Sequence, residues 1–191
     1  MPHTSHTVLQ STTNTCGAIS LVATTYAIID IAIKSRGQQL SFTQEALVVL
    51  LIFNFGVAFG GVFGVFDDGT PSFCTFQGFM IQFNSFGVVL WVMKIVWDMY
   101  KWIVKKKRLD ALKSRFKRDV IGIFILAFVP SIVLVGMNFY SQSGPWCWIS
   151  VDKPAARYAC FYAPLWSLIS IALLWCRTSN TIWSVRSKGH G

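Results

Sequence analysis

Long apolar stretches alternate with shorter polar segments along the chain. A membrane-spanning helix needs about 20 mostly apolar residues, because the hydrocarbon core of a bilayer is about 30 Å thick. Five stretches meet this requirement, at about residues 16–33, 46–66, 73–104, 120–140 and 158–176. Residues 1–15 form a tail before this transmembrane bundle of residues 16–176, and residues 177–191 form a tail after it. The pattern predicts an all-α integral membrane protein built as a helical bundle of five transmembrane helices.

Composition supports this fold class. Of the 191 residues, 53% are hydrophobic and only 13% are charged, and the mean hydropathy is +0.51. A soluble domain carries roughly 25% charged residues, so this chain has too few to cover a water-exposed surface. The net charge of +9 does not indicate nucleic-acid binding, because the positive side chains are concentrated beside the apolar stretches.

Positive charges mark one side of the predicted bundle. Residues 101–118 contain nine Lys or Arg side chains and one acidic residue, Asp110. Near the ends of the spans, Lys and Arg number 14 on the side of this segment and two on the other. The positive-inside rule then places the N-terminus outside and the C-terminal tail in the cytoplasm. We expect a multi-pass protein of the plasma membrane.

No arrangement of side chains indicates catalysis. The five cysteines and three histidines lack the spacing of a metal site, and no acid–base or nucleophile set is visible. Ionisable residues deep in the membrane would indicate a transporter or channel, but only Asp30, Lys94 and Asp98 approach the spans, all at the inner edge. The sequence predicts a protein that is not an enzyme, without catalytic residues, metal or cofactor.

Two cysteines fall on the predicted outer side of the membrane. Cys74 begins the third span, and Cys147 lies in the loop between the fourth and fifth spans. The oxidising compartment allows a disulfide between them, although two free thiols on one side fit the same positions. Trp146 and Trp148 flank Cys147. This loop is either an interfacial aromatic anchor or a lid over the mouth of the bundle.

Four short segments together resemble a known receptor family. They are CTFQGF at residues 74–79, LW at 90–91, GPWCWI at 144–149 and YAPLW at 162–166. In this order they are similar to the cyclic AMP receptor-like family of G-protein-coupled receptors, over about residues 17–175. The resemblance implies a disulfide between Cys74 and Cys147. It also implies an extracellular ligand, which could be a small molecule such as cyclic AMP or a nutrient, and a heterotrimeric G protein as the partner.

The resemblance also sets an expectation about the number of helices. Receptors of this family have seven spans, and the five spans here correspond to the first five of them. The polar residues 177–191 cannot supply two further helices. We therefore expect either a receptor fragment or an altered function. The alternative function is a non-signalling membrane protein that associates with full-length receptors, as in a receptor dimer, and regulates them.

Polar side chains recur along the third span. Gln77, Asn84, Trp91 and Asp98 are spaced by seven residues, and a helix drifts only about 20° per heptad. They therefore share one face, which should point into the bundle because polar groups are costly against lipid. Such a face could contact a ligand, or it could only form hydrogen bonds between helices. The candidate ligand-binding residues are Gln77, Asn84, Trp146 and Trp148.

The inner end of the third span carries a further candidate site. Lys94 and Asp98 lie four residues apart and can pair on the helix flank. By resemblance to a receptor, this region faces the G protein. The candidate residues are Lys94, Asp98, Lys105, Lys106, Lys107 and Arg108. Simple charge pairing, membrane topology and attraction to anionic lipid explain the same charges.

The second span contains glycines at helix-packing intervals. Gly56, Gly60 and Gly64 form two consecutive G-x-x-x-G patterns. Small residues at this spacing allow helix backbones to approach closely. We expect packing within the chain rather than dimerisation.

Overall fold

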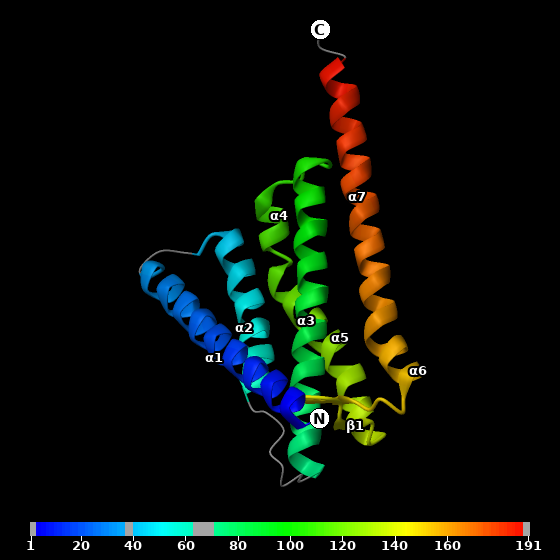
Figure 1. The fold of residues 1–191 in the computed structure, drawn as a ribbon. Helices are drawn as coiled ribbons and strands as arrows, with labels where there is room; N and C mark the ends of the chain where they lie inside the picture. Colours follow the sequence, from blue (N-terminus) through cyan, green and yellow to red (C-terminus); the bar gives the residue numbers. More distant parts are fainter. Residues whose placement is uncertain (1–2, 37–39, 63–70, 189–191) are drawn as a thin grey trace.

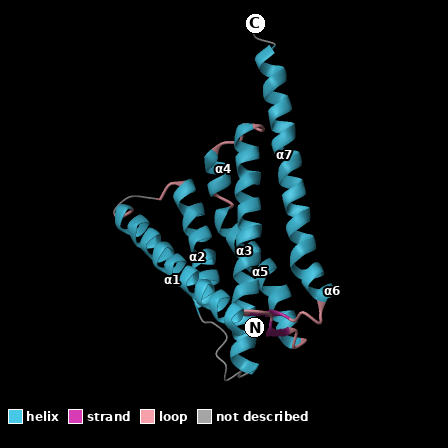
Figure 2. Ribbon diagram, viewed as in Figure 1, coloured by secondary structure: helices cyan, strands magenta, loops and turns pink. Residues whose placement is uncertain are grey.

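The computed structural model describes residues 3–36, 40–62 and 71–188. In chain order the elements are α1 His3–Lys34, α2 Phe42–Val62, α3 Pro71–Ile103, α4 Leu109–Lys113, α5 Phe116–Gly136, β1 Tyr140–Gln142, β2 Cys147–Ile149, α6 Pro154–Arg157, the π-helix η1 Tyr158–Tyr162 and α7 Ala163–Lys188 (Figures 1 and 2). Five helical stretches of the described chain are long and apolar enough to cross a membrane. The predicted all-α membrane bundle is therefore confirmed.

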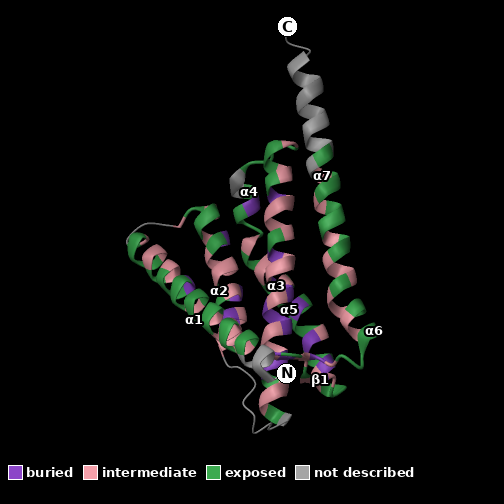
Figure 3. Cartoon of the chain, viewed as in Figure 1, coloured by how far each residue is buried: buried purple, intermediate pink, exposed green. Residues whose placement is uncertain are grey.

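Helix α3 lies at the centre of the bundle. It contacts α2, α5, α7 and both strands, whereas α1 packs on α2 (Figure 1). Buried residues accordingly gather on α3 and on the parts of α2 and α5 that face it, while α1 and α7 are mostly exposed (Figure 3). The exposed apolar faces of these outer helices are the surfaces that a bilayer would cover.

Aromatic rings fill the space between α2, α3 and α5. Phe83 on α3 lies edge-on to Phe124 on α5, with the ring centroids 4.9 Å apart, and edge-on to Phe53 on α2 at 5.9 Å. Edge-to-face geometry is favourable because the positive edge of one ring meets the negative face of the other. These rings join the three helices in the middle of the bundle.

The glycines of α2 allow a close approach to α3. A Cβ atom at Gly56 would lie 2.2 Å from the side chain of Asn84, and one at Gly60 would lie 2.9 Å from Ile81. The predicted packing within the chain is confirmed at these two glycines. Gly64, the third of the pattern, and the predicted end of the second span at residues 63–66 lie outside the described residues.

Hydroxyl groups explain why α1 is longer than predicted. The helix begins at His3 rather than near Cys16. Thr12 and Thr13 each donate a hydrogen bond to the backbone carbonyl four residues earlier, at 2.8 and 2.9 Å. A hydroxyl satisfied in this way can remain within a helix, so the Thr-rich start of the chain continues the predicted span. At the other end of the chain, α7 likewise continues to Lys188, beyond the predicted end of the fifth span.

Local capping moves two other helix ends. Ser41 and Gln44 bond reciprocally, with the Ser41 N–H donating to the Gln44 side-chain oxygen at 2.9 Å and the Gln44 N–H donating to the Ser41 hydroxyl at 3.3 Å. This capping box starts α2 at Phe42, earlier than predicted. Helix α5 ends at Gly136, because Asn138 adopts a left-handed conformation with φ of 52°. Tyr140 therefore belongs to β1 and not to the fourth span.

Candidate functional site

A β-hairpin covers one end of α3, which we call the hairpin end. Strands β1 and β2 pair antiparallel, with Tyr140 opposite Ile149 and Gln142 opposite Cys147. A disulfide joins Cys147 to Cys74 in the first turn of α3. The bridge that the resemblance implied is therefore present. It fastens the loop to the bundle, which favours the lid over the simple interfacial anchor.

Gln77 connects the hairpin to two helices. Its side chain is 1% exposed. The amide nitrogen donates to the carbonyl of Gly60 on α2 at 2.9 Å, and the amide oxygen accepts from the backbone N–H of Cys147 at 2.9 Å. The side chain thus bonds to the neighbouring α2 and β2, as the hydrogen-bonding interpretation of the polar face proposed.

Gln82 forms a second bridge, to the start of the fifth span. It is completely buried, its amide oxygen accepts from the indole N–H of Trp148 at 2.8 Å, and its amide nitrogen donates to the carbonyl of Cys160 at 3.2 Å. In an α-helix that carbonyl would bond to the N–H of residue 164, but Pro164 has none. The position of Pro164 was the signal in the sequence that could have identified the partner of Gln82.

Trp148 is enclosed by aromatic and cationic groups. Its ring lies edge-on to Phe161 and Tyr162, with centroid distances of 5.5 and 6.0 Å. The guanidinium of Arg157 lies 5.2 Å from the ring centroid, and its Nε donates to the carbonyl of Ile149 at 2.8 Å. Arg157 was not identified from the sequence. It fixes both the backbone of β2 and the tryptophan that faces Gln82.

Tyr140 bonds strand β1 to α5. Its hydroxyl donates to the carbonyl of Ser131 on α5 at 3.1 Å, and its ring lies where a Cβ atom at Gly78 would approach to 2.5 Å. Burial raises the pKa of Tyr140, so the hydroxyl keeps the proton that it donates.

The four candidate ligand-binding residues are only partly brought together. Gln77 and Trp148 both lie at the hairpin end, where Gln77 bonds to the backbone of Cys147 and Trp148 bonds to Gln82. Trp146, the residue before β2, is half-buried. Asn84 lies about two helical turns deeper, where it is buried and donates to the carbonyl of Met80 at 2.8 Å. Asn84 is therefore remote from the hairpin, because seven residues of α-helix rise about 10 Å.

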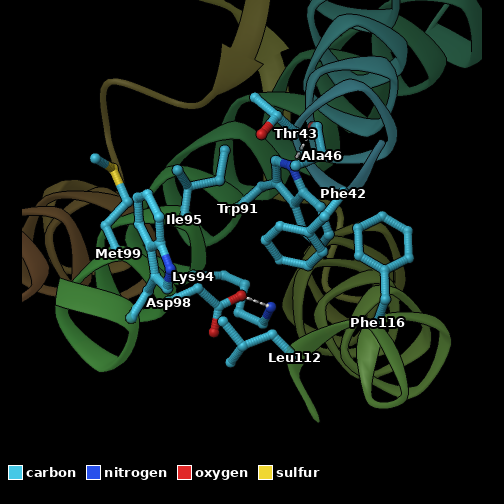
Figure 4. A pocket seen from close by; sticks show the side chains of 11 residues that line it. Phe42, Thr43, Ala46, Trp91, Lys94, Ile95, Asp98, Met99, Leu112 and Phe116 are labelled. Carbon is cyan, nitrogen blue, oxygen red and sulfur yellow. Dashed lines mark hydrogen bonds and ion pairs between the residues drawn. The ribbon is translucent and has the colours of Figure 1, made fainter. Parts of the chain in front are cut away.

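A cavity of about 210 Å³ lies at the opposite end of α3, which we call the basic end because residues 101–118 follow it (Figure 4). Its walls are apolar apart from a few polar groups, with Phe42 from α2, Leu112 from α4 and Phe116 from α5. Trp91 borders it and donates its indole N–H to the carbonyl of Ala46 at 2.7 Å.

Lys94 carries a buried positive charge in this cavity. It forms an ion pair with Asp98 one turn along α3, as the spacing predicted, and its Nζ lies 3.1 Å from Oδ2 of Asp119 on α5. The side chains of Lys94 and Asp98 are only 11% and 5% exposed. Asp119 was not identified from the sequence, and it makes this ion pair a contact between α3 and α5.

The six candidate G-protein-facing residues separate into two groups. Lys94 and Asp98 are enclosed by neighbouring helices. The four side chains of residues 105–108 are exposed in the loop between α3 and α4. Only this second group is accessible to a protein partner in the described conformation.

Comparison with known proteins identifies the family. The family model described as slime mold cyclic AMP receptor matches residues 64–190. The chain belongs to the slime mold cyclic AMP receptor family. It is 28% identical over 158 residues to "G-protein coupled receptor 1" of Arabidopsis thaliana, covering 72% of this chain and 48% of that relative.

Two relatives from Dictyostelium discoideum agree with this membership. The chain is 29% identical to "Cyclic AMP receptor 4" and 26% identical to "Cyclic AMP receptor 2", in both cases over 121 residues and 62% of the chain. These alignments cover 27% and 31% of the two relatives. The chain thus spans about half the length, or less, of the curated relatives that it matches. It is a receptor-like, multi-pass membrane protein.

Replacing Gln77 with leucine is expected to lower the free energy of unfolding by about 2 kcal/mol, because the buried Cys147 N–H and the Gly60 carbonyl would both lose their partner. Thermal unfolding in detergent measures this change. Gln142→Leu is the matched control, since Gln142 is exposed in the same hairpin, and it should change stability by less than about 0.5 kcal/mol. Equal losses in both variants would contradict the bridging role of Gln77.

Proposed function

We propose that this protein detects an extracellular ligand at the hairpin end and passes the signal to a heterotrimeric G protein at the basic end. Membership of the receptor family supports this role. The observation that carries the proposal is the hairpin, which is bonded to α3 by the disulfide, to α2 through Gln77 and to η1 through Gln82. A ligand that displaces the hairpin therefore acts directly on three helical elements.

The proposed orientation places the hairpin end outside the plasma membrane and the basic end in the cytoplasm. Helices α1 and α7 support it, because α1 begins at the level of the hairpin along the bundle and α7 ends beyond the basic end (Figure 1). An odd number of spans places the start of the first span and the end of the last span on opposite sides of the membrane. The positive-inside rule then assigns the basic end to the cytoplasm.

Cyclic AMP is the first ligand to test. Two relatives are named as cyclic AMP receptors. The hairpin end of this chain offers cations for a phosphate in Lys153 and Arg157, and an indole for a purine in Trp146. A nutrient or another small molecule is the alternative ligand that the same binding assay can screen.

The exposed cations of residues 105–108 are the proposed contact for the G protein. The test is GDP–GTP exchange on a heterotrimeric G protein, measured with the chain in lipid nanodiscs and cyclic AMP as the added ligand. We expect faster exchange with wild type, reduced about tenfold by Lys106→Gln/Lys107→Gln through lost electrostatic steering. Lys117→Gln/Arg118→Gln removes the same charge from exposed positions on α5 and serves as the control. Exchange unaffected by the wild-type chain would contradict coupling.

Association with full-length receptors is the second candidate function. The exposed apolar faces of α1 and α7 favour it, since neither of these spans is buried within the described chain. Such faces can meet another receptor helix as well as lipid. Co-purification with a seven-helix relative would support this role, and recovery of the chain as a monomer in the presence of that relative would contradict it.

A further inference from the structure

Three aromatic rings gather between α3 and α7 at the basic end. Trp97 and Tyr100 come from α3 and Trp175 from α7. The centroids of the two tryptophan rings lie 4.3 Å apart, and that of Tyr100 lies 5.4 Å from Trp97 and 6.0 Å from Trp175. This stacking is a side-chain contact between two helices that run beside each other in Figure 1.

Two lysines lie against these rings. The Nζ of Lys101 is 4.8 Å from the centroid of Trp97, and the Nζ of Lys105 is 5.6 Å from the same centroid and 5.8 Å from that of Tyr100. We call these five residues the aromatic–basic cluster. A cation over a ring is attracted by the ring's quadrupole, which orients the ammonium group.

The positive charge of the cluster is largely uncompensated. Lys101 has Asp98 at 3.9 Å, but that carboxylate already pairs with Lys94. Lys105 is exposed and forms no ion pair with the residues that the structure describes. Each ammonium group has three N–H donors, and a ring face does not use them as a carboxylate would. The cluster therefore offers oriented donors to an anion.

The depth of the cluster indicates which anion can reach it. The apolar span of α3 ends at Ile103, and on α7 the charged residue Arg177 follows two positions after Trp175. The cluster therefore lies where both spans leave the hydrocarbon, which is the level of the lipid headgroups. Tryptophan and tyrosine are enriched at this level of a membrane. On α7 next to Trp175, Ile171 and Leu174 are apolar and 38% and 61% exposed, so they offer a surface for acyl chains.

We propose that the aromatic–basic cluster between α3 and α7 binds the headgroup of an anionic phospholipid. Lys101 and Lys105 donate to the phosphate, the rings hold their ammonium groups, and the acyl chains lie along the apolar surface below. This site goes beyond the diffuse attraction of a basic loop, because it assigns binding to two lysines among the many at this end. The lipid site does not rest on the proposed ligand, and it shares only Lys105 with the proposed G-protein contact.

Native mass spectrometry of the full chain tests the proposal. The chain is released from detergent micelles that hold equal amounts of phosphatidylserine and phosphatidylcholine. We expect bound phosphatidylserine to predominate in wild type, and the variant Lys101→Gln/Lys105→Gln to bind it about 30-fold more weakly, since each lysine near a lipid surface contributes about fivefold. Equal binding of the two lipids by wild type would overturn the proposal.

Two matched variants separate a site from a general charge effect. Lys117→Gln/Arg118→Gln removes the same charge at the same end from exposed residues, and it should keep binding close to wild type. A loss equal to that of the Lys101/Lys105 variant would show diffuse attraction and overturn the site. Lys101→Arg/Lys105→Arg keeps the charge and should keep the preference, because guanidinium also binds phosphate. A loss with arginine would show that the first effect was structural.

A soluble headgroup separates a lipid from a free anion. Glycerophosphoserine carries the same phosphate and serine without acyl chains. We expect it to leave bound phosphatidylserine in place, because it cannot use the apolar surface beside the cluster. Displacement at a comparable concentration would assign the cluster to a free phosphate compound and overturn the lipid assignment.

Discussion

The variant Cys74→Ser/Cys147→Ser is expected to lose about 4 kcal/mol of unfolding free energy. The bridge joins residues 73 positions apart in the sequence, and in the chain-entropy description a cross-link over that length removes this much conformational freedom from the unfolded state. The loss would also release the hairpin from α3. Denaturation in detergent, followed by circular dichroism, measures the change in stability.

Cys16→Ser is the control for the loss of a thiol. Cys16 is a free, exposed cysteine on α1, and its replacement should leave the unfolding curve unchanged. A reducing agent should destabilise wild type as much as the double substitution does, and it should not destabilise the double variant further. A double variant as stable as wild type would show that the bridge contributes nothing to the fold.

Replacing Lys94 with methionine is expected to lower the free energy of unfolding by about 3 kcal/mol, because it removes the nearest cation from a buried carboxylate and leaves only Lys101 at 3.9 Å. Asp98 is 5% exposed, and Asp119 would lose the same partner. The double variant Lys94→Met/Asp98→Leu removes one of the carboxylates together with the cation, and it should recover part of the loss. Thermal unfolding in detergent is the measurement.

The chain contains a matched exposed pair as a control. Lys34 and Asp30 also lie four residues apart and pair at 2.8 Å, but their side chains are 71% and 38% exposed. An exposed pair contributes about 0–1 kcal/mol, so Lys34→Met should have little effect. If the two lysine variants lost the same stability, burial would not be what makes the Lys94 pair important.

Features that lie within one helix were predictable from the sequence. Heptad spacing placed Gln77, Asn84, Trp91 and Asp98 on one face of α3, and all four side chains are at most 5% exposed. The Lys94–Asp98 pair followed from a separation of four residues. Both predictions use only the period of the α-helix, which does not depend on neighbouring elements.

Contacts between elements were not predictable in the same way. The bonds of Gln82 to Trp148 and Cys160, and the pairing of Lys94 with Asp119, depend on how far one helix is shifted along another. Hydrophobic periodicity does not specify that shift. The disulfide was the exception, because the predicted outer location of both cysteines allowed the bridge and the resemblance to a receptor family implied it.

Boundaries were the other point of difference. The sequence pattern treated Thr-rich residues before Cys16 as a tail and Tyr140 as the end of a span. Hydroxyl bonds to the helix backbone extend α1 to His3, and the left-handed Asn138 ends α5 early. Apolar runs report which residues tolerate lipid, whereas helix ends are decided by single side chains that satisfy or interrupt the backbone.

Helix α7 can tilt as a rigid rod about its junction with η1 at Pro164. The pivot is the π-helix η1. Gln82 donates to the Cys160 carbonyl of η1, and it also accepts a hydrogen bond from Trp148 of the hairpin. From Ala163 to Trp175 the helix is about 18 Å long, so a tilt of about 10° at the pivot displaces Trp175 by about 3 Å. A small rotation of one amide side chain beneath the hairpin would thus be magnified at the far side of the membrane, where Trp175 stacks on Trp97.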